Sequence, residues 1–233
     1  MARLCSILGL MKPDLSQYLP RYRHLAGMPD VHLRHLGRVD SVDIWEVAGK
    51  VIRDLKDIEF TQSAYDLNKS YIPKGEVWVD RDAAKTGEQK TWLYRALAER
   101  NCRTRLGMSA DAAFNEAKRA EEALRGKPLA PPPRVQLVRL NVIKGFTVWL
   151  VNGKLVRDHY YVDFTQGGNG FVYDWAPKNE IWIDNALVPE EYMPTTIHEL
   201  TEAVWMRDRG LSYEQAHEHA NVAEITYRRT TPW

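Results

Sequence analysis

The amino-acid sequence predicts an α+β fold of two tandem duplicated modules, each a small antiparallel β-sheet followed by a helical hairpin. Three observations predict this architecture. One segment of the chain recurs at a constant offset, apolar residues within that segment alternate as they do in strands, and a pair of helical patterns follows each copy. The same arrangement of strands and helices is therefore expected twice along the chain.

The repeat begins near Val42 and runs without a gap at an offset of 104 residues, so that Trp45 matches Trp149 and Arg53 matches Arg157. The stretch DIWEVAGKVIRD of the first copy matches TVWLVNGKLVRD of the second, EFTQ matches DFTQ, and PKGEVWVD matches PKNEIWID. Identities at one constant spacing in three separate stretches indicate an internal duplication.

The shared stretches have the pattern of strands. Apolar residues alternate over 147–151 and again over 154–156, and Asn152-Gly153 between them is typical of a two-residue β-hairpin. The run from Ile181 to Asp184 predicts a further strand. Together these patterns favour a small antiparallel sheet in each module.

Two helices are predicted after the strands of the second copy. The first covers Pro189 to Arg209, because proline suits a first helical turn and Gly210 can end the helix. The second begins after Ser212, whose hydroxyl can cap it, and Gln215 three residues later completes a capping box. The glycine-containing turn between them predicts a helical hairpin, and a counterpart is expected over 91–122.

The domain boundaries follow from these elements. Residues 1–40 are predicted to form an N-terminal extension, 41–125 the first α+β module, and 135–233 the second module, which carries the candidate metal site. Between the modules, residues 126–134 are rich in proline and predict a stiff linker.

Composition argues against several classes of protein. The chain of 233 residues has 32 basic and 31 acidic side chains, so its net charge favours neither a nucleic-acid groove nor an acidic tail. Cys5 and Cys102 fit no disulfide framework, which favours a reducing compartment such as the cytoplasm. The apolar run from Leu4 to Met11 is too short to span a bilayer, and no membrane association is expected.

Side chains able to do chemistry gather in the predicted helical hairpin of the second module. His198 and Glu202 are four residues apart and therefore project from one face of the first helix. His217 lies on the second helix and can supply a third ligand, which leaves an open coordination position for water. We expect these three residues to bind a metal ion and Glu199 to act as the catalytic base.

The stretch HELTE, residues 198–202, resembles part of the His-Glu-x-x-His helix of zincin metalloproteases. Glu202 stands where the zincin helix has its second histidine. The resemblance implies a zinc ion and a role for Glu199 in activating water. A carboxylate ligand widens the choice to another divalent transition metal, such as manganese or iron.

The first module lacks these ligands. At an offset of 103 residues, Arg95 takes the place of His198 and Phe114 takes the place of His217. One interpretation is that the first module is degenerate and the chemistry is confined to the second. The other is that neither module is active and the histidines are ordinary residues of a solvated helical pair.

The second module also resembles a module of uncharacterised phage and prophage proteins. The resemblance rests on the pattern DFTxGG, EIWID, HELxE and AH, which lies within residues 158–224. It implies a cytoplasmic protein of an infected bacterial host, and it implies no established activity. The loop TQGGNG at 165–170 is found only in the second copy, and it predicts either a wide hairpin turn or a close backbone approach to a ligand.

Two main functions are predicted. The first is a metal-dependent hydrolase, protease-like, with its site in the second module. The alternative is a non-catalytic phage or prophage protein that binds a protein partner, in a structural or host-inhibitory role, with the helical hairpin as scaffold only. Nucleic-acid binding is a third and weaker interpretation, since basic residues near both ends are set against a neutral chain.

Overall fold

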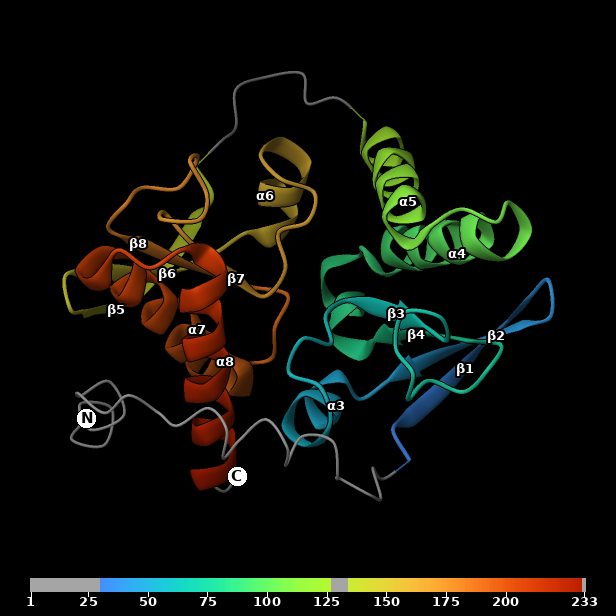
Figure 1. The fold of residues 1–233 in the computed structure, drawn as a ribbon, viewed down its shortest axis with the longest axis horizontal. Coiled ribbons are helices and arrows are strands. Elements are labelled where there is room, and N and C mark those ends of the chain that lie inside the picture. Colours follow the sequence, from blue (N-terminus) through green and yellow to red (C-terminus); the bar gives the residue numbers. More distant parts are fainter. Residues whose placement is uncertain (1–29, 127–133, 232–233) are drawn as a thin grey trace.

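A computed structural model describes residues 30–126 and 134–231 of the chain (Figure 1). Most of the predicted extension and of the proline-rich linker therefore lies outside the described residues. The described part contains two four-stranded mixed β-sheets and six α-helices, an α+β arrangement. The first half (residues 30–126) and the second half (residues 134–231) lie side by side in Figure 1.

The sheet of the first half has the strand order β1-β2-β4-β3. β1 (His32–Val39) pairs antiparallel with β2 (Val42–Val47), β2 pairs parallel with β4 (Glu76–Asp80), and β3 (Ser63–Tyr65) pairs antiparallel with β4 at the far edge. β1 lies within the stretch predicted as an extension, so the folded part of the first half begins earlier than its predicted boundary.

The sheet of the second half has the equivalent order β5-β6-β8-β7. β5 (Gln136–Ile143) pairs antiparallel with β6 (Phe146–Val151), β6 pairs parallel with β8 (Glu180–Asp184), and β7 (Gly167–Asn169) pairs antiparallel with β8. In the parallel pairs, Trp45 of β2 lies opposite Trp78 of β4, and Trp149 of β6 lies opposite Trp182 of β8. The two halves therefore match in topology and in register.

The prediction of wholly antiparallel sheets is wrong for the central pair of each half, where the strands run parallel. Parallel neighbours need a crossover connection. A short helix forms part of it, α3 (Gly49–Leu55) in the first half and α6 (Gly153–His159) in the second. The predicted hairpin turn at Asn152 is therefore the start of α6, where the Asn152 side chain accepts a hydrogen bond from the backbone N–H of Leu155.

Glycine at the start of each short helix makes room for a carboxylate. A Cβ atom at Gly49 would lie 2.0 Å from Oδ2 of Asp80, and one at Gly153 would lie 2.0 Å from Oδ1 of Asp184. Each aspartate is bound in turn by a buried arginine of the same half. The Asn-Gly pair therefore caps a helix that has a close neighbour, although the same pair is also typical of a hairpin turn.

A pair of long helices follows each sheet. After the 3-10 helix η2 (Arg81–Thr86), the first half has α4 (Gln89–Arg105) and α5 (Ala110–Arg125), and the second half has α7 (Pro189–Arg209) and α8 (Tyr213–Thr230). The two helices of each pair pack together, and the first of them covers its own sheet (Figure 1). Within the described ranges, no helix is both long and apolar enough to cross a membrane.

The predicted ends of the last two helices are confirmed. Pro189 begins α7, and Gly210 follows its last residue with a left-handed φ of 64°. Ser212 caps α8, and both hydrogen bonds of the capping box with Gln215 are present. These ends define the turn that brings α8 back along α7.

Apolar side chains fix α7 against its sheet. Phe146, Ile181 and Leu200 belong to one buried cluster between β6, β8 and α7. A second buried cluster contains Phe164 and Trp182. The helix that carries two candidate ligands is therefore held in place by the hydrophobic core, independently of any ion.

The two halves exchange buried ion pairs. Arg53 of the first half donates to Glu191 of the second at 2.8 Å, and Arg157 of the second half donates to Glu88 of the first at 2.9 Å. Further ion pairs between matching positions flank these two, Arg125 with Asp158 and Arg228 with Asp54. Burying one of these charges without its partner is strongly destabilising, which disfavours arrangements of the halves that mispair them.

Candidate metal centre

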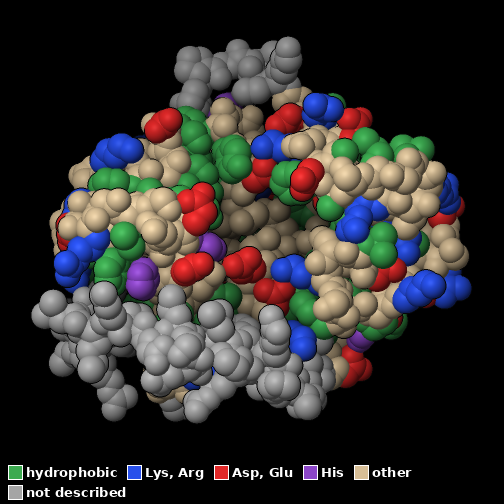
Figure 2. Space-filling model, in the orientation of Figure 1, with side chains coloured by type: hydrophobic (Ala, Val, Ile, Leu, Met, Phe, Trp, Pro, Cys, Tyr) green, Lys and Arg blue, Asp and Glu red, His purple; other side chains and the backbone are tan. Residues whose placement is uncertain are grey.

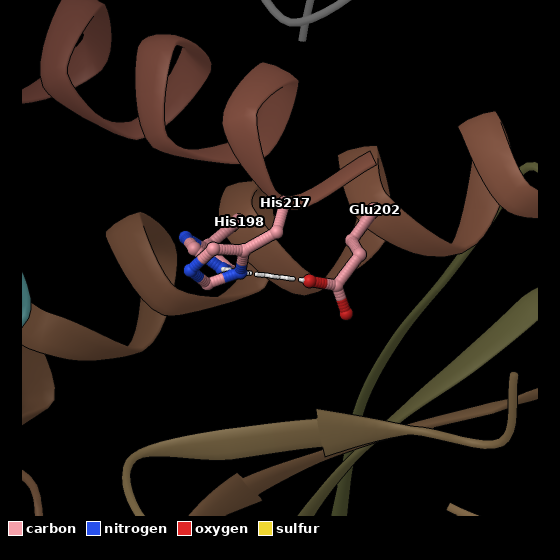
Figure 3. Close-up of side chains that lie close together, drawn as sticks. All are labelled: His198, Glu202 and His217. Carbon is pink, nitrogen blue, oxygen red and sulfur yellow. Dashed lines mark hydrogen bonds and ion pairs between the residues drawn. The ribbon is translucent and has the colours of Figure 1, made fainter. Parts of the chain in front are cut away.

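The three predicted ligands come together between α7 and α8. His198 and Glu202 lie one turn apart on α7, and His217 faces them from α8 (Figure 3). One ring nitrogen from each histidine and one carboxylate oxygen all lie within 4.8 Å of one another. The structure thus places the three residues in one cluster.

The donor atoms form a triangle whose size is compatible with a metal ion. His198 Nε2 lies 3.2 Å from His217 Nδ1 and 3.9 Å from Glu202 Oε2, and His217 Nδ1 lies 2.9 Å from the same carboxylate oxygen. Ligands at about 2.0–2.1 Å from a tetrahedral zinc ion are about 3.3 Å apart. The three distances bracket that spacing, and a tetrahedral ion bound to these atoms would keep one position open.

Hydrogen bonds cannot satisfy all of the close contacts within this cluster. His217 Nδ1 has two close neighbours, His198 Nε2 and Glu202 Oε2. A ring nitrogen carries either a proton or a lone pair, so Nδ1 can make a full hydrogen bond to only one of these two neighbours. A cation between the three atoms would serve all of them.

The other ring nitrogen of each histidine faces a carboxylate. His198 Nδ1 lies 2.9 Å from Glu224 Oε2 on α8, and His217 Nε2 lies 3.5 Å from Glu59 Oε1 of the first half. Metal-binding histidines usually present their second N–H to a carboxylate, which orients the ring and leaves the lone pair on the ligating nitrogen. Both histidines therefore have the kind of second contact that is usual for metal-binding histidines.

Glu199, the predicted base, lies beside the cluster. Its side chain is buried, and Asn169 Nδ2 of β7 donates to Glu199 Oε2 at 3.1 Å and to Glu202 Oε1 at 2.8 Å. One amide group thereby holds the predicted base next to the predicted carboxylate ligand. Burial, reinforced by the charge of Glu202, raises the pKa of Glu199 to about 7.

The carboxylates also raise the pKa of both histidines. Hydrogen bonding to Glu202 and to Glu59 raises the pKa of His217 to about 10. Burial lowers the pKa of His198, but the hydrogen bond to Glu224 and the surrounding negative charge outweigh it and shift the pKa upward. When no cation is bound, the negative charge of the surrounding carboxylates therefore favours the protonated form of these histidines.

Gly167 lets β7 approach α7 closely enough for Asn169 to reach it, and Gly168 makes room for a ring on the other face of the strand. A Cβ atom at Gly167 would lie 2.8 Å from Thr195 Cγ2 and 3.0 Å from Glu199 Cγ, and one at Gly168 would lie 2.7 Å from a tyrosine ring atom. The glycine-rich stretch predicted as a wide turn or a ligand loop is thus an edge strand, and the close approach is to a helix.

Asn169 and Glu59 also belong to this site and are not predicted from the sequence. Asn169 stands in a glycine-rich stretch that only the second half has, and this difference between the copies was the available signal. No local pattern marks Glu59, because Asn221, whose side chain donates to it, is 162 residues away in the sequence.

The matching position of the first half has different side chains. Arg95 and Phe114 take the places of the two histidines, and the Tyr65 hydroxyl donates at 2.8 Å to Glu99, the counterpart of the carboxylate ligand. Arg95 is bound by Asp163 of the second half at 2.5 Å. In the described ranges, one group of three side chains has the geometry of a metal site, and it lies in the second half.

A cavity of about 390 Å³ lies at the matching position of the first half, where Arg95, Glu99 and Phe114 line it. Glu59, which faces His217, is part of its wall, and Tyr161 and Asp163 of the second half line it opposite residues of β3, α4 and α5. Figure 2 shows the molecular surface hollowed between the two halves. Ligand pockets range over about 300–1,000 Å³, so this cavity has the volume of a small-molecule site.

Comparison with known proteins adds no assignment. No family model matches the chain, and neither a curated protein nor a solved structure matches it. The interpretation of the site therefore rests on its geometry and on the chemistry of its side chains.

Proposed function

We propose that the chain is a metal-dependent hydrolase, protease-like, in which His198, Glu202 and His217 hold zinc or another divalent transition-metal ion. The observation that carries this proposal is the triangle of donor atoms, with a carboxylate behind each histidine. Two imidazoles and one carboxylate with an open fourth position are the ligand set of many catalytic zinc sites.

The side chains around the cluster supply the remaining parts of a hydrolytic site. A bound ion of this kind lowers the pKa of a water ligand and polarises the bond to be cleaved. Glu199 is the group that would accept the proton of that water, because its buried carboxylate lies next to the ligand Glu202. Asn169 keeps both carboxylates oriented through its two hydrogen bonds.

The burial of the cluster favours a second candidate function. The side chains of His198 and Glu202 are only 13% and 4% exposed. In this alternative the ion is structural and fixes α7 to α8, and the chain acts by binding a protein partner, as a phage or prophage protein in a structural or host-inhibitory role. Coordination by three protein ligands and a water distinguishes the hydrolase from this alternative, which needs a closed site.

We also propose that the two halves are tandem copies of one module, with the chemistry confined to the second copy. The equal strand order, the equal register of the central strands and the equivalent ion pairs across the interface support this proposal. The resemblance of the second copy to a phage and prophage module favours the cytoplasm of an infected bacterium as its location.

The first test is the metal content of chelator-free protein, measured by mass spectrometry. Wild type should retain about one equivalent of a divalent transition metal, and His198→Ala and His217→Ala should lose it, because each removes a ligand. His219→Ala is the matched control, since His219 also lies on α8 but stacks on Trp205 with ring centroids 4.3 Å apart. A wild-type protein that remains metal-free in the presence of zinc, manganese and iron would refute the proposal.

The second test separates catalysis from structural binding. Glu199→Gln keeps the size of the side chain and removes its basicity, so the variant should keep its metal and lose hydrolysis of chromogenic ester, phosphodiester and peptide substrates. Glu218→Gln, on the exposed face of α8, serves as the control. A metal-loaded wild type that cleaves none of these substrates would favour the structural alternative.

A further inference from the structure

Each half inserts one acidic side chain into the helical pair of the other. Glu59 and Asp163 occupy the same position in the two copies, at the start of the stretches EFTQ and DFTQ. Asp163 reaches Arg95 and Lys118 of the first half, at 2.5 and 2.6 Å. Glu59 reaches the equivalent place in the second half, where α8 presents His217 and Asn221.

The two acids meet partners of different chemistry. Arg95 and Lys118 are cations throughout the physiological pH range, so the contact of Asp163 is a permanent ion pair. Glu59 lies 3.5 Å from His217 Nε2, and Asn221 Nδ2 donates to it at 3.1 Å. The other nitrogen of this imidazole, Nδ1, faces the candidate metal centre, so the contact of Glu59 acts on a candidate ligand.

We propose that Glu59 is a positioning residue of the metal centre, contributed by the opposite half of the molecule. This inference rests on the function proposed above. His217 Nδ1 is the nitrogen that lies beside His198 and Glu202, and a carboxylate at Nε2 holds the ring proton there. With an ion at Nδ1 the remaining ring proton would be on Nε2, and the carboxylate of Glu59 would hold the ring in the orientation that binding requires.

The backbone next to Glu59 is anchored firmly enough for this task. Phe60 is fully buried, and its carbonyl accepts hydrogen bonds from Arg53 Nη1 at 3.1 Å and from Gln166 Nε2 of the second half at 3.4 Å. Asn221 then restrains the carboxylate itself. A partner held in this way can orient His217 even though the Glu59 side chain is 56% exposed.

One consequence is that metal affinity depends on the contact between the halves. The ligands all belong to the second half, but the group that orients one of them belongs to the first. The equivalent contact of Asp163 stabilises the same interface with no ligand behind it. The near symmetry of the molecule therefore offers a control for the effect of packing alone.

The experiment compares Glu59→Gln and Asp163→Asn in the full chain. Affinity for Zn²⁺ is measured by competition with a chromophoric chelator, and the absorption spectrum of the Co²⁺-loaded protein reports the coordination of His217. Glu59→Gln should weaken Zn²⁺ binding about tenfold or more and shift the Co²⁺ bands, because the amide cannot hold the imidazole proton as a carboxylate does. Glu59→Asp keeps the charge and should weaken binding less. Asp163→Asn should change stability but leave Zn²⁺ affinity within about twofold of wild type.

Each outcome bears on one proposal. Wild-type affinity in Glu59→Gln, or an equal loss in Asp163→Asn, would overturn the role of Glu59 while leaving the metal centre in place. No Zn²⁺ binding by the wild type would overturn the proposed function and this inference with it. Thermal denaturation of the metal-free variants verifies that each of them is folded.

Discussion

At the scale of single residues, the buried side chain of Asn169 makes three hydrogen bonds. It is fully buried, it donates to two carboxylates, and its own side-chain oxygen accepts a hydrogen bond from the backbone N–H of Phe171. Buried carboxylates that lose a donor retain the full desolvation cost of their charge. Asn169 therefore stabilises a pair of acids that would otherwise repel one another.

We expect Asn169→Ala to lower the free energy of unfolding by about 2–3 kcal/mol, because two buried carboxylates lose their shared donor. The measurement is urea denaturation of metal-free protein. Tyr65→Phe is the control, since it removes the single hydroxyl that donates to Glu99 at the matching place of the first half. Its cost should be about 1 kcal/mol. Equal effects of the two substitutions would contradict the bridging role of Asn169.

At the scale of elements, the turn between α7 and α8 sets the position of His217. Ser212 accepts a hydrogen bond from the backbone N–H of Gln215, and Gln215 Oε1 accepts one from the backbone N–H of Ser212. His217 follows within the next turn of α8. The two hydrogen bonds of the capping box fix the first turn of α8, and they thereby fix the position of His217 along α7.

Ser212→Ala should lower the free energy of unfolding by about 1 kcal/mol, because it removes both the cap and the geometry of the capping box. The effect is measured by urea denaturation. Ser109→Ala removes the equivalent cap of α5, where the hydroxyl accepts from the backbone N–H of Ala112 at 3.3 Å and Ala112 has no side-chain acceptor to complete a capping box. The loss for Ser109→Ala should be smaller, and a larger one would argue against the added value of the box.

At the scale of the whole molecule, the interface between the halves depends on buried charge. Glu88 accepts from Arg157 of the second half, at 2.9 Å, and from Arg125, at 2.7 Å. Burial raises the pKa of Glu88, but its hydrogen bonds with Arg157 and the positive charge of both arginines outweigh that effect, and the pKa is lowered below the usual 4.5. The folded state therefore favours the ionised form of this residue.

This lowered pKa predicts the direction of the pH dependence. A depressed folded-state pKa adds stability that is complete above the unfolded value, near 4.5, and that is lost as the pH falls through the folded value. The free energy of unfolding of the wild type should therefore rise with pH across the acid range up to that value. Urea denaturation at a series of pH values measures the slope.

Glu88→Gln should cost about 3–5 kcal/mol at neutral pH, because it leaves buried arginines without their counter-charge, and it should flatten the acid slope. Glu116→Gln is the control, because Glu116 forms an exposed ion pair with Arg119 on α5. This substitution should cost less than about 1 kcal/mol. A Glu88→Gln variant with the stability of wild type would show that solvent already screens this pair.

The sequence by itself determined the local features of the site. His198 and Glu202 share a face because an α-helix repeats every 3.6 residues, and the ends of α7 and α8 follow from proline, glycine and a capping box in the chain. The recurrence of one segment predicted two similar halves, and the structure contains two sheets of equal topology. These features depend on backbone hydrogen bonds between residues close in sequence.

Only the tertiary structure decided the direction of the central strands and the partners of the ligands. Asn152-Gly153 fits both a hairpin and a capped helix, and the close approach of Asp184 to Gly153 shows which of them forms. Glu59 meets α8 from the opposite half, across 162 residues of sequence to Asn221. Such contacts depend on how separate elements pack and bury their charges, and no local spacing of residues encodes them.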